Sequence, residues 1–197
     1  HTSYQKIADK CKVGNTKVEY YFPKKEIFIK DFLKIYFGKL FVFLKKQKQV
    51  DINDILTSFY YLGYFYFDFL LNNPNMKLIT QDLVTNRKLT AGVLDLEISW
   101  AEKNFDLKKF SRFKFSDALT LASGGAYELI YKYQRNHQKI TPVTLEEGLL
   151  LSLSACLGIN INETLERFAV AKNKLHDLKS VKEIFFSNDK TLFSLLI

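Results

Sequence analysis

Apolar residues recur at helical spacing along almost the whole chain. In residues 26–47 they form a wide stripe on one side, with lysines on the other, which is typical of an amphipathic helix. Glycine and proline are scarce, with 8 and 3 residues. We therefore predict an all-α fold. Further helices are predicted over residues 2–11, 15–22, 55–71, 75–84, 87–104, 113–134, 144–157 and 161–178.

The segment 55–71 is apolar on nearly all sides and contains eight aromatic residues. It is shorter than the ~20 residues of a membrane span and carries Asp68, so we predict a central helix of a bundle and no membrane partner. Its aromatic side chains form either ordinary core or the wall of a cavity for a small, mostly apolar ligand. The candidate ligand-binding residues are Tyr60, Tyr61, Tyr64, Phe65 and Phe67, with Trp100 from the helix 87–104.

Two short helices are predicted at the beginning of the chain. The first starts at Thr2 or Ser3, whose hydroxyl groups suit a helix N-cap. Residues 12–14 interrupt the pattern, and a second helix covers 15–22, with Val18, Tyr21 and Phe22 on its inward face. Pro23 ends this helix. This spacing is typical of a helix-turn-helix, whose second helix enters the DNA major groove.

The same segment carries a spaced set of nine residues, which are Thr2, Ile7, Ala8, Val13, Val18, Tyr21, Phe22, Lys25 and Phe28. In these residues it resembles the DNA-binding domain of the TetR family of bacterial transcriptional regulators. Three positions differ from the usual pattern of that family. Lys12 replaces the glycine of the turn, Gly14 replaces a serine N-cap, and Glu19 replaces a phosphate-contacting tyrosine. A left-handed backbone is therefore expected at Lys12.

The resemblance implies a DNA-binding domain in residues 1–47 and a helical domain for ligand binding and dimerisation in residues 48–197. It also implies that a further helix precedes Thr2. The expected base-contacting residues are Asn15, Thr16 and Tyr20. The expected phosphate-contacting residues are Thr2, Ser3, Lys17 and Lys25.

The distribution of charge agrees with a DNA partner. Residues 1–50 contain 12 lysines and 4 acidic residues, a net charge of +8, whereas the remaining residues sum to zero. A basic domain attracts the phosphate backbone and releases counterions on binding. The alternative interpretation is a solvated, lysine-rich surface.

The helices 113–134 and 144–157 are similar to the last two long helices of TetR-family regulators, which form a four-helix dimer interface. Thr144 is the predicted N-cap of the second helix and Glu147 completes a capping box. The alternative is an intramolecular hairpin. The candidate interface residues are Ser123, Gly124, Gly125, Tyr127, Leu150, Leu153 and Leu157.

The sequence does not indicate catalysis, a cofactor or a metal site. His1, His137 and His176 lie far apart, and no glycine-rich phosphate loop is present. Glu146 and Glu147 are interpreted as an ordinary helix start. Cys11 and Cys156 are predicted to be buried, reduced thiols, which favours a cytoplasmic protein.

These observations together lead to one hypothesis and two rivals. The hypothesis is a homodimeric, ligand-responsive transcriptional regulator, a repressor that a small, mostly apolar effector releases from a double-stranded operator. The first rival is a helical small-molecule-binding protein that has lost ordinary DNA binding, for which Glu19 and Lys12 are the reason. The second rival is an enzyme on a helical scaffold.

Overall fold

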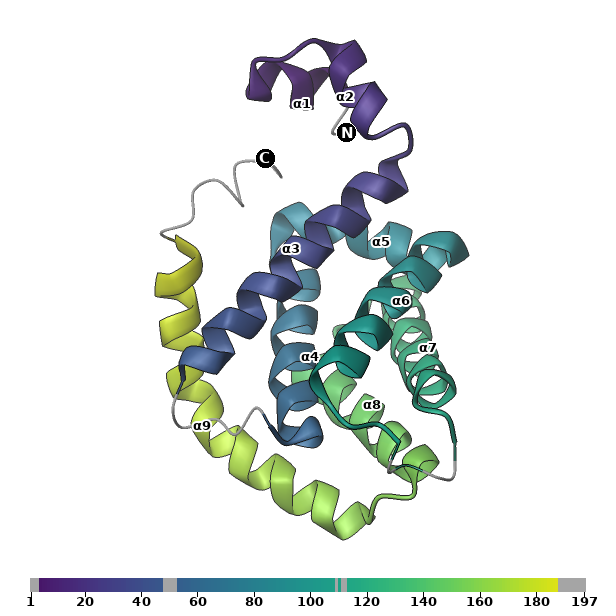
Figure 1. Cartoon of the computed structure of the whole chain (residues 1–197), viewed down its shortest axis with the longest axis vertical. Helices are drawn as coiled ribbons and strands as arrows, with labels where there is room; N and C mark the ends of the chain where they lie inside the picture. The colour runs from purple at the N-terminus through teal and green to yellow at the C-terminus, as the bar shows by residue number, and fades with distance from the viewer. Residues whose placement is uncertain (1–3, 48–52, 109, 111–112, 188–197) are drawn as a thin grey trace.

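The computed structural model describes residues 4–47, 53–108, 110 and 113–187. In these residues the chain forms nine α-helices and one short 3-10 helix without strands, so the all-α prediction is confirmed (Figure 1). The elements are α1 (Tyr4–Cys11), α2 (Asn15–Tyr21), α3 (Lys25–Lys46), α4 (Ile55–Asn72), η1 (Pro74–Met76), α5 (Lys77–Thr85), α6 (Arg87–Asn104), α7 (Phe115–Arg135), α8 (Pro142–Leu157) and α9 (Ile161–Ser187).

Side-chain caps fix the beginnings of three long helices. Asp54 accepts a hydrogen bond from the Thr57 backbone at the start of α4, and Asn86 caps α6 in the same way. The predicted cap of α8 is wrong, because Thr141 caps this helix and Pro142 occupies its first turn. Thr144 lies inside the helix and donates its backbone N–H to Thr141 Oγ1 at 3.1 Å. The helix therefore begins earlier than its apolar run suggests.

Three helices end in the same left-handed C-cap. Lys12 and His137 both have φ of 54°, and Gly158 has φ of 75°. In each case the next residue donates its N–H to a carbonyl five residues back, as in Val13 to Ala8 at 3.0 Å. The expected left-handed backbone at Lys12 is confirmed. Only Gly158 adopts this conformation without the steric cost that a side chain adds.

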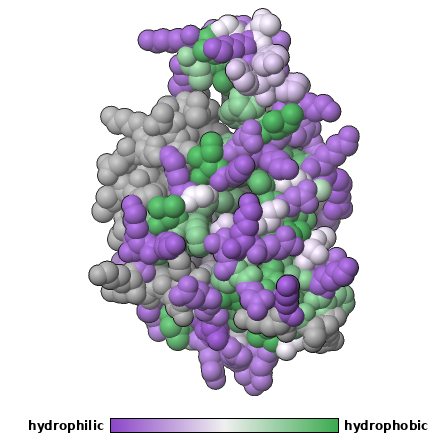
Figure 2. Space-filling model, in the orientation of Figure 1, coloured by the Kyte–Doolittle hydropathy of each residue, from purple (hydrophilic) through white to green (hydrophobic). Residues whose placement is uncertain are grey.

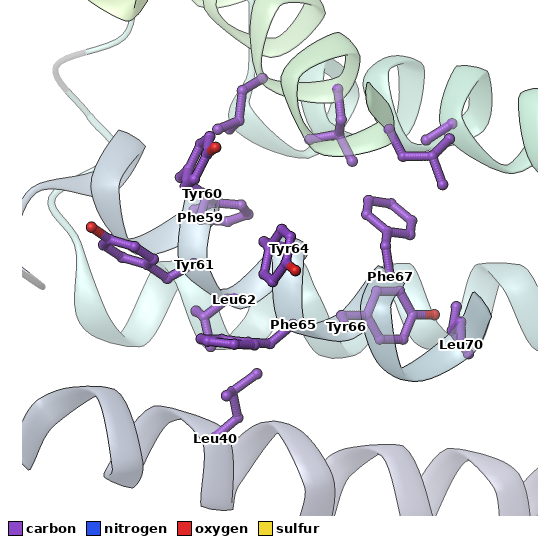
Figure 3. Packing of buried hydrophobic residues seen from close by; sticks show 14 of the residues in the cluster. Leu40, Phe59, Tyr60, Tyr61, Leu62, Tyr64, Phe65, Tyr66, Phe67 and Leu70 are labelled. Atoms are coloured by element: carbon purple, nitrogen blue, oxygen red, sulfur yellow. The ribbon is translucent and has the colours of Figure 1, made fainter. Parts of the chain in front are cut away.

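Helix α4 lies at the centre of the bundle and contacts α3, α5, α8 and α9 (Figure 1). Its side chains point in several directions, with Phe65 on the side that faces Leu40 of α3 (Figure 3). Two buried tyrosines of the bundle donate their hydroxyl groups to backbone carbonyls. Tyr36 Oη donates to the Phe65 carbonyl at 2.9 Å, and Tyr61 Oη donates to the Ala171 carbonyl at 3.2 Å. An apolar helix is thus buried on all its faces, as predicted.

Other sequence expectations have mixed outcomes. No helix in the described ranges has both the length and the apolarity needed to cross a bilayer.

Helix α9 continues to Ser187, nine residues past its predicted end at Leu178. The burial predicted for the cysteines is wrong for Cys11, which is exposed because it lies outside the buried side of α1, and Cys156 is half-buried.

Candidate functional site

A cavity of about 310 Å³ lies between α3, α4, α6, α7 and α8. This volume is at the lower end of the range for small-molecule sites in proteins. Most of the lining is apolar or aromatic, and the polar groups are few. The lining residues are Lys34, Phe37, Gly38, Phe59, Leu62, Gly63, Tyr66, Phe67, Leu96, Glu97, Ser99, Trp100, Lys103, Leu119, Ser123, Tyr127, Glu146 and Leu149.

Aromatic rings form much of the wall and hold one another in place. Trp100, the only tryptophan of the chain, makes edge-to-face contacts with Phe41, Phe59 and Phe105 at centroid distances of 5.1–5.7 Å. Tyr66 and Tyr127 share a hydrogen bond of 2.9 Å between their hydroxyl groups. Burial raises the pKa of both hydroxyls, so they remain neutral at physiological pH. The aromatic part of the wall is therefore uncharged.

A buried glutamate interrupts this apolar lining. Glu146 is 1% exposed, and neither of its carboxyl oxygens has a hydrogen-bond partner among the described residues. Gly63 of α4 makes room for this carboxyl group, because a Cβ atom at Gly63 would lie 1.8 Å from Glu146 Oε2. Glu147 differs sharply, since its Oε1 lies 2.6 Å from Lys172 Nζ. A buried acid without a partner is rare and points to a function.

Glu97 brings a second carboxyl group to the same cavity from α6. Burial raises the pKa of Glu97 to about 8. The pKa of Glu146 is also raised, first by burial and then by the charge of Glu97. None of the ion pairs among the described residues joins a lysine or arginine to Glu97 or Glu146.

The structure brings only two of the predicted ligand-binding residues, Phe67 and Trp100, to the cavity. Tyr60 packs against Phe168 at a centroid distance of 5.4 Å, and Tyr61 bonds the Ala171 carbonyl. Tyr64 and Phe65 also belong to the core outside the cavity, where Phe65 contacts Phe43. The face of α4 that lines the cavity carries instead Phe59, Leu62, Gly63, Tyr66 and Phe67, which recur at helical spacing.

Sequence reasoning missed this face because α4 is apolar on all sides, so periodicity does not select one of them. It also missed Glu146, interpreted as part of an ordinary helix start. A signal was present, because Glu146 is in helical register with Leu150, Leu153 and Leu157, which are all buried. A charged residue on the apolar face of a helix would have marked the site.

The helix-turn-helix candidate forms a separate unit at the N-terminal end of α3, where α1 packs against α2 (Figure 1). Figure 2 shows that hydrophilic residues cover much of this end of the molecule. Thr16, Lys17 and Tyr20 of α2 are exposed, and Tyr20 is 80% exposed. Asn15 is half-buried, and its amide donates to Glu19 Oε1 at 2.7 Å.

The structure says little about the remaining candidate DNA-contacting residues. Thr2 and Ser3 lie outside the described residues, and Lys25 is the first residue of α3. Tyr21, predicted to face inward with Val18 and Phe22, is 61% exposed. That inward prediction is wrong, because Tyr21 packs edge-to-face on Tyr20 at the surface instead.

Helix α3 belongs to both the N-terminal unit and the cavity. It starts just after α2 and contributes Lys34, Phe37 and Gly38 to the cavity lining. At its first turn Glu26 Oε1 accepts a hydrogen bond of 3.0 Å from Asn86 Nδ2, the cap of α6. Both α3 and α6 line the cavity, so this bond joins two of its walls.

Most of the predicted dimer-interface residues point into the chain itself. Ser123, Tyr127, Leu150, Leu153 and Leu157 are 6% exposed or less, because α7 and α8 pack tightly on each other and α8 packs on α4. Two of them, Ser123 and Tyr127, line the cavity. These five side chains therefore contribute to the packing of the single chain.

The outer side of the same two helices carries small residues. Gly124 is half-buried, and Gly125, Gly148 and Ser152 are exposed. A Cβ atom at any of these three glycines would meet nothing within 4 Å. The packing of the single chain therefore does not require a glycine at these positions.

Comparisons of the chain with protein-family models, curated proteins and solved structures gave no match. The described residues also contain no group of three or more histidine, cysteine, aspartate or glutamate side chains that could hold a metal ion.

Proposed function

We propose that this chain is a ligand-responsive, DNA-binding transcriptional regulator that resembles the TetR family and acts as a homodimer. The observation that carries the proposal is the continuity of α3. One uninterrupted helix, Lys25–Lys46, follows the helix-turn-helix candidate at one end and lines the cavity near its middle. A ligand in the cavity would act directly on the helix that holds the DNA-binding unit.

The geometry of α3 sets the size of the expected response. The distance along the helix from Lys25 to Phe37 is about 18 Å at 1.5 Å per residue. A tilt of about 10° at the cavity would move the N-terminal unit by about 3 Å over this length. Such a displacement in both subunits changes the separation of two DNA-binding units that must match half-sites ~34–36 Å apart.

The exposed surface of α2 supports the DNA part of the proposal. Lys17 provides a charge for the phosphate backbone, and Thr16 and Tyr20 are free to approach base edges. The excess positive charge of residues 1–50 lies in the same part of the chain. The bond between Asn15 and Glu19 occupies an amide that would otherwise read a base. This bond favours the second candidate, a ligand-binding protein without DNA affinity.

Titration of fluorescent duplexes from the chain's own upstream DNA separates these two candidates. We expect fluorescence anisotropy to show binding of the duplex. The logarithm of the association constant should fall linearly with the logarithm of the salt concentration. Lys17→Ala should weaken binding and reduce that slope by about 1, whereas Lys108→Ala, an exposed lysine between α6 and α7, should change neither. If the wild-type protein binds no duplex, the DNA part of the proposal is wrong and the second candidate replaces it.

The dimer is proposed on the outer face of α7 and α8. Glycines inside helices cost ~1 kcal/mol each, and here they leave room for the close approach of another helix. Sedimentation equilibrium should show a dimer for the wild type and a monomer for Gly148→Arg. Ala91→Arg, at an exposed position in α6, is the matched control and should remain dimeric. A monomeric wild type would contradict the homodimer.

A further inference from the structure

The polar groups of the cavity are distributed in a way that selects among ligand classes. Two carboxyl groups, Glu97 and Glu146, line an otherwise aromatic and aliphatic space. Glu146 has no partner within the described chain, and its carboxyl group occupies the space that a Cβ atom at position 63 would fill. Removing both carboxyl groups in favour of apolar residues would give a simpler and more stable core. Their presence therefore indicates a partner that comes from outside the chain.

The charged and titratable groups that face the cavity come from five helices. Lys34 and Lys103 have exposed side chains, so their ammonium groups reach water at the edge of the site. The hydroxyls of Tyr66 and Tyr127 bond each other. The complete set is Lys34 from α3, Tyr66 from α4, Glu97 and Lys103 from α6, Tyr127 from α7 and Glu146 from α8. Away from that edge, the titratable groups of the lining are therefore the two acids and the two tyrosines.

The aromatic rings complement the acids. Phe37, Phe59, Phe67 and Trp100 join the two tyrosines in the lining, and an indole or phenol face attracts a cation within about 6 Å. A ligand without a polar group would leave Glu146 without a partner. An anionic ligand would be repelled by either carboxyl group once that group ionises. A positively charged ligand avoids both costs.

We propose that the cavity binds a lipophilic organic cation, an amine or quaternary ammonium compound, with Glu146 and Glu97 opposing its charge and the aromatic rings enclosing its apolar part. This inference rests on the ligand-binding half of the proposed function and specifies the effector. The volume of about 310 Å³ suits a compact cation of this class rather than a long-chain lipid.

The acids also predict how binding depends on pH. Burial raises the pKa of Glu97 to about 8, so without a ligand this carboxyl group holds a proton at neutral pH. Burial raises the pKa of Glu146 as well. A bound cation favours the ionised carboxylate and displaces a proton. The affinity for a permanently charged cation should therefore rise up to tenfold per pH unit from pH 6 to 8 and level off above pH 8.

The test compares benzyltrimethylammonium with neopentylbenzene, its uncharged carbon isostere, and with phenylbutyrate, an anion of similar size. Binding to the full chain without DNA is followed by Trp100 fluorescence and calorimetry. We expect the cation to bind at least tenfold more tightly than either of the other two. Equal or tighter binding of the isostere or the anion, or no binding of the cation, would overturn the proposal.

Three variants assign the effect to residues. Glu146→Gln should weaken cation binding at least tenfold and change the affinity for the isostere less than twofold. Glu97→Gln should also weaken cation binding and provides a second test if Glu146→Gln does not fold. Glu102→Gln, an exposed position on α6, is the control and should bind like the wild type. Unchanged cation affinity in both folded cavity variants would refute the assignment.

A separate titration keeps this inference distinct from the proposed function. Cation binding without DNA tests the ligand class alone. Release of a bound duplex by the same cation tests regulation. If the protein binds the cation but no duplex, the proposed ligand class is supported and the proposed regulator is contradicted. If it binds a duplex but not the cation, the DNA-binding proposal is supported and the proposed ligand class is contradicted.

Discussion

Glutamine in place of Glu97 should stabilise the empty protein at neutral pH. Burial raises the pKa of this carboxyl group from its ordinary value of 4.5 to about 8. Between pH 4.5 and 8 the folded chain therefore keeps a proton that the unfolded chain releases. The contribution of Glu97 to the free energy of unfolding consequently falls as the pH rises through this window.

The magnitude follows from the width of the window. At pH 7 the unfolded chain gains about 3.5 kcal/mol from ionisation of Glu97, at about 1.4 kcal/mol for each pH unit above 4.5. Because the side chain is half-buried, water screens part of this effect, and we expect about 2 kcal/mol. Glutamine is nearly isosteric and does not ionise. Glu97→Gln should thus unfold at a higher urea concentration at pH 7 and close to the wild type at pH 4.5.

Urea unfolding at both pH values, followed by Trp100 fluorescence and far-ultraviolet circular dichroism, measures this difference. Glu102→Gln on the exposed side of the same helix should have no comparable effect. Equal stability of Glu97→Gln and wild type at pH 7 would refute the reasoning. A stabilisation that persisted at pH 4.5 would refute it too, because it would have to arise from packing rather than from ionisation.

Two further predictions concern the ends of helices. His137→Gly should raise the free energy of unfolding by about 1 kcal/mol, because His137 has a left-handed backbone, and Gly158→Ala should lower it by a similar amount; thermal melts should show shifts of opposite sign. Asp54→Ala should destabilise the protein by about 1–2 kcal/mol at pH 7, because it removes the cap of α4 and the ion pair with Arg167. Burial opposes ionisation of Asp54, but hydrogen bonds from Thr57 and Arg167 outweigh it and lower the pKa below 3.8. The destabilisation should therefore be present above pH 3.8 and disappear as the pH falls below that value. Urea unfolding at pH 7 and pH 2 measures the stability difference between Asp54→Ala and the wild type. The same difference at both pH values would contradict this explanation.

The sequence predicts the helices well because their signals are local. Apolar spacing and breakers such as Pro23 placed α3, α4 and α6 within two residues of their ends. The start of α8 was missed because two threonines, Thr141 and Thr144, both suit a cap, and the cap chosen by the chain depends on Pro142 in the first turn.

The candidate site was harder to predict because tertiary packing creates it. Glu146 and Glu147 are identical neighbours, yet one faces the cavity and the other pairs with Lys172 of α9. Glu97 joins Glu146 only because α6 and α8 line the same space. The register of Glu146 with buried leucines distinguishes it from Glu147, but neither the local charge pattern nor a motif places Glu97 in the same cavity.

The central position of α4 has a consequence for synthesis of the chain. Tyr61 of α4 bonds the Ala171 carbonyl, 110 residues later, and α8 packs along the same helix. A growing chain therefore presents this aromatic-rich segment long before the helices that cover it have been made, a situation that favours aggregation. Yield in the cell should consequently respond to chaperone supply and slower translation, and versions shortened before α8 should accumulate in the insoluble fraction.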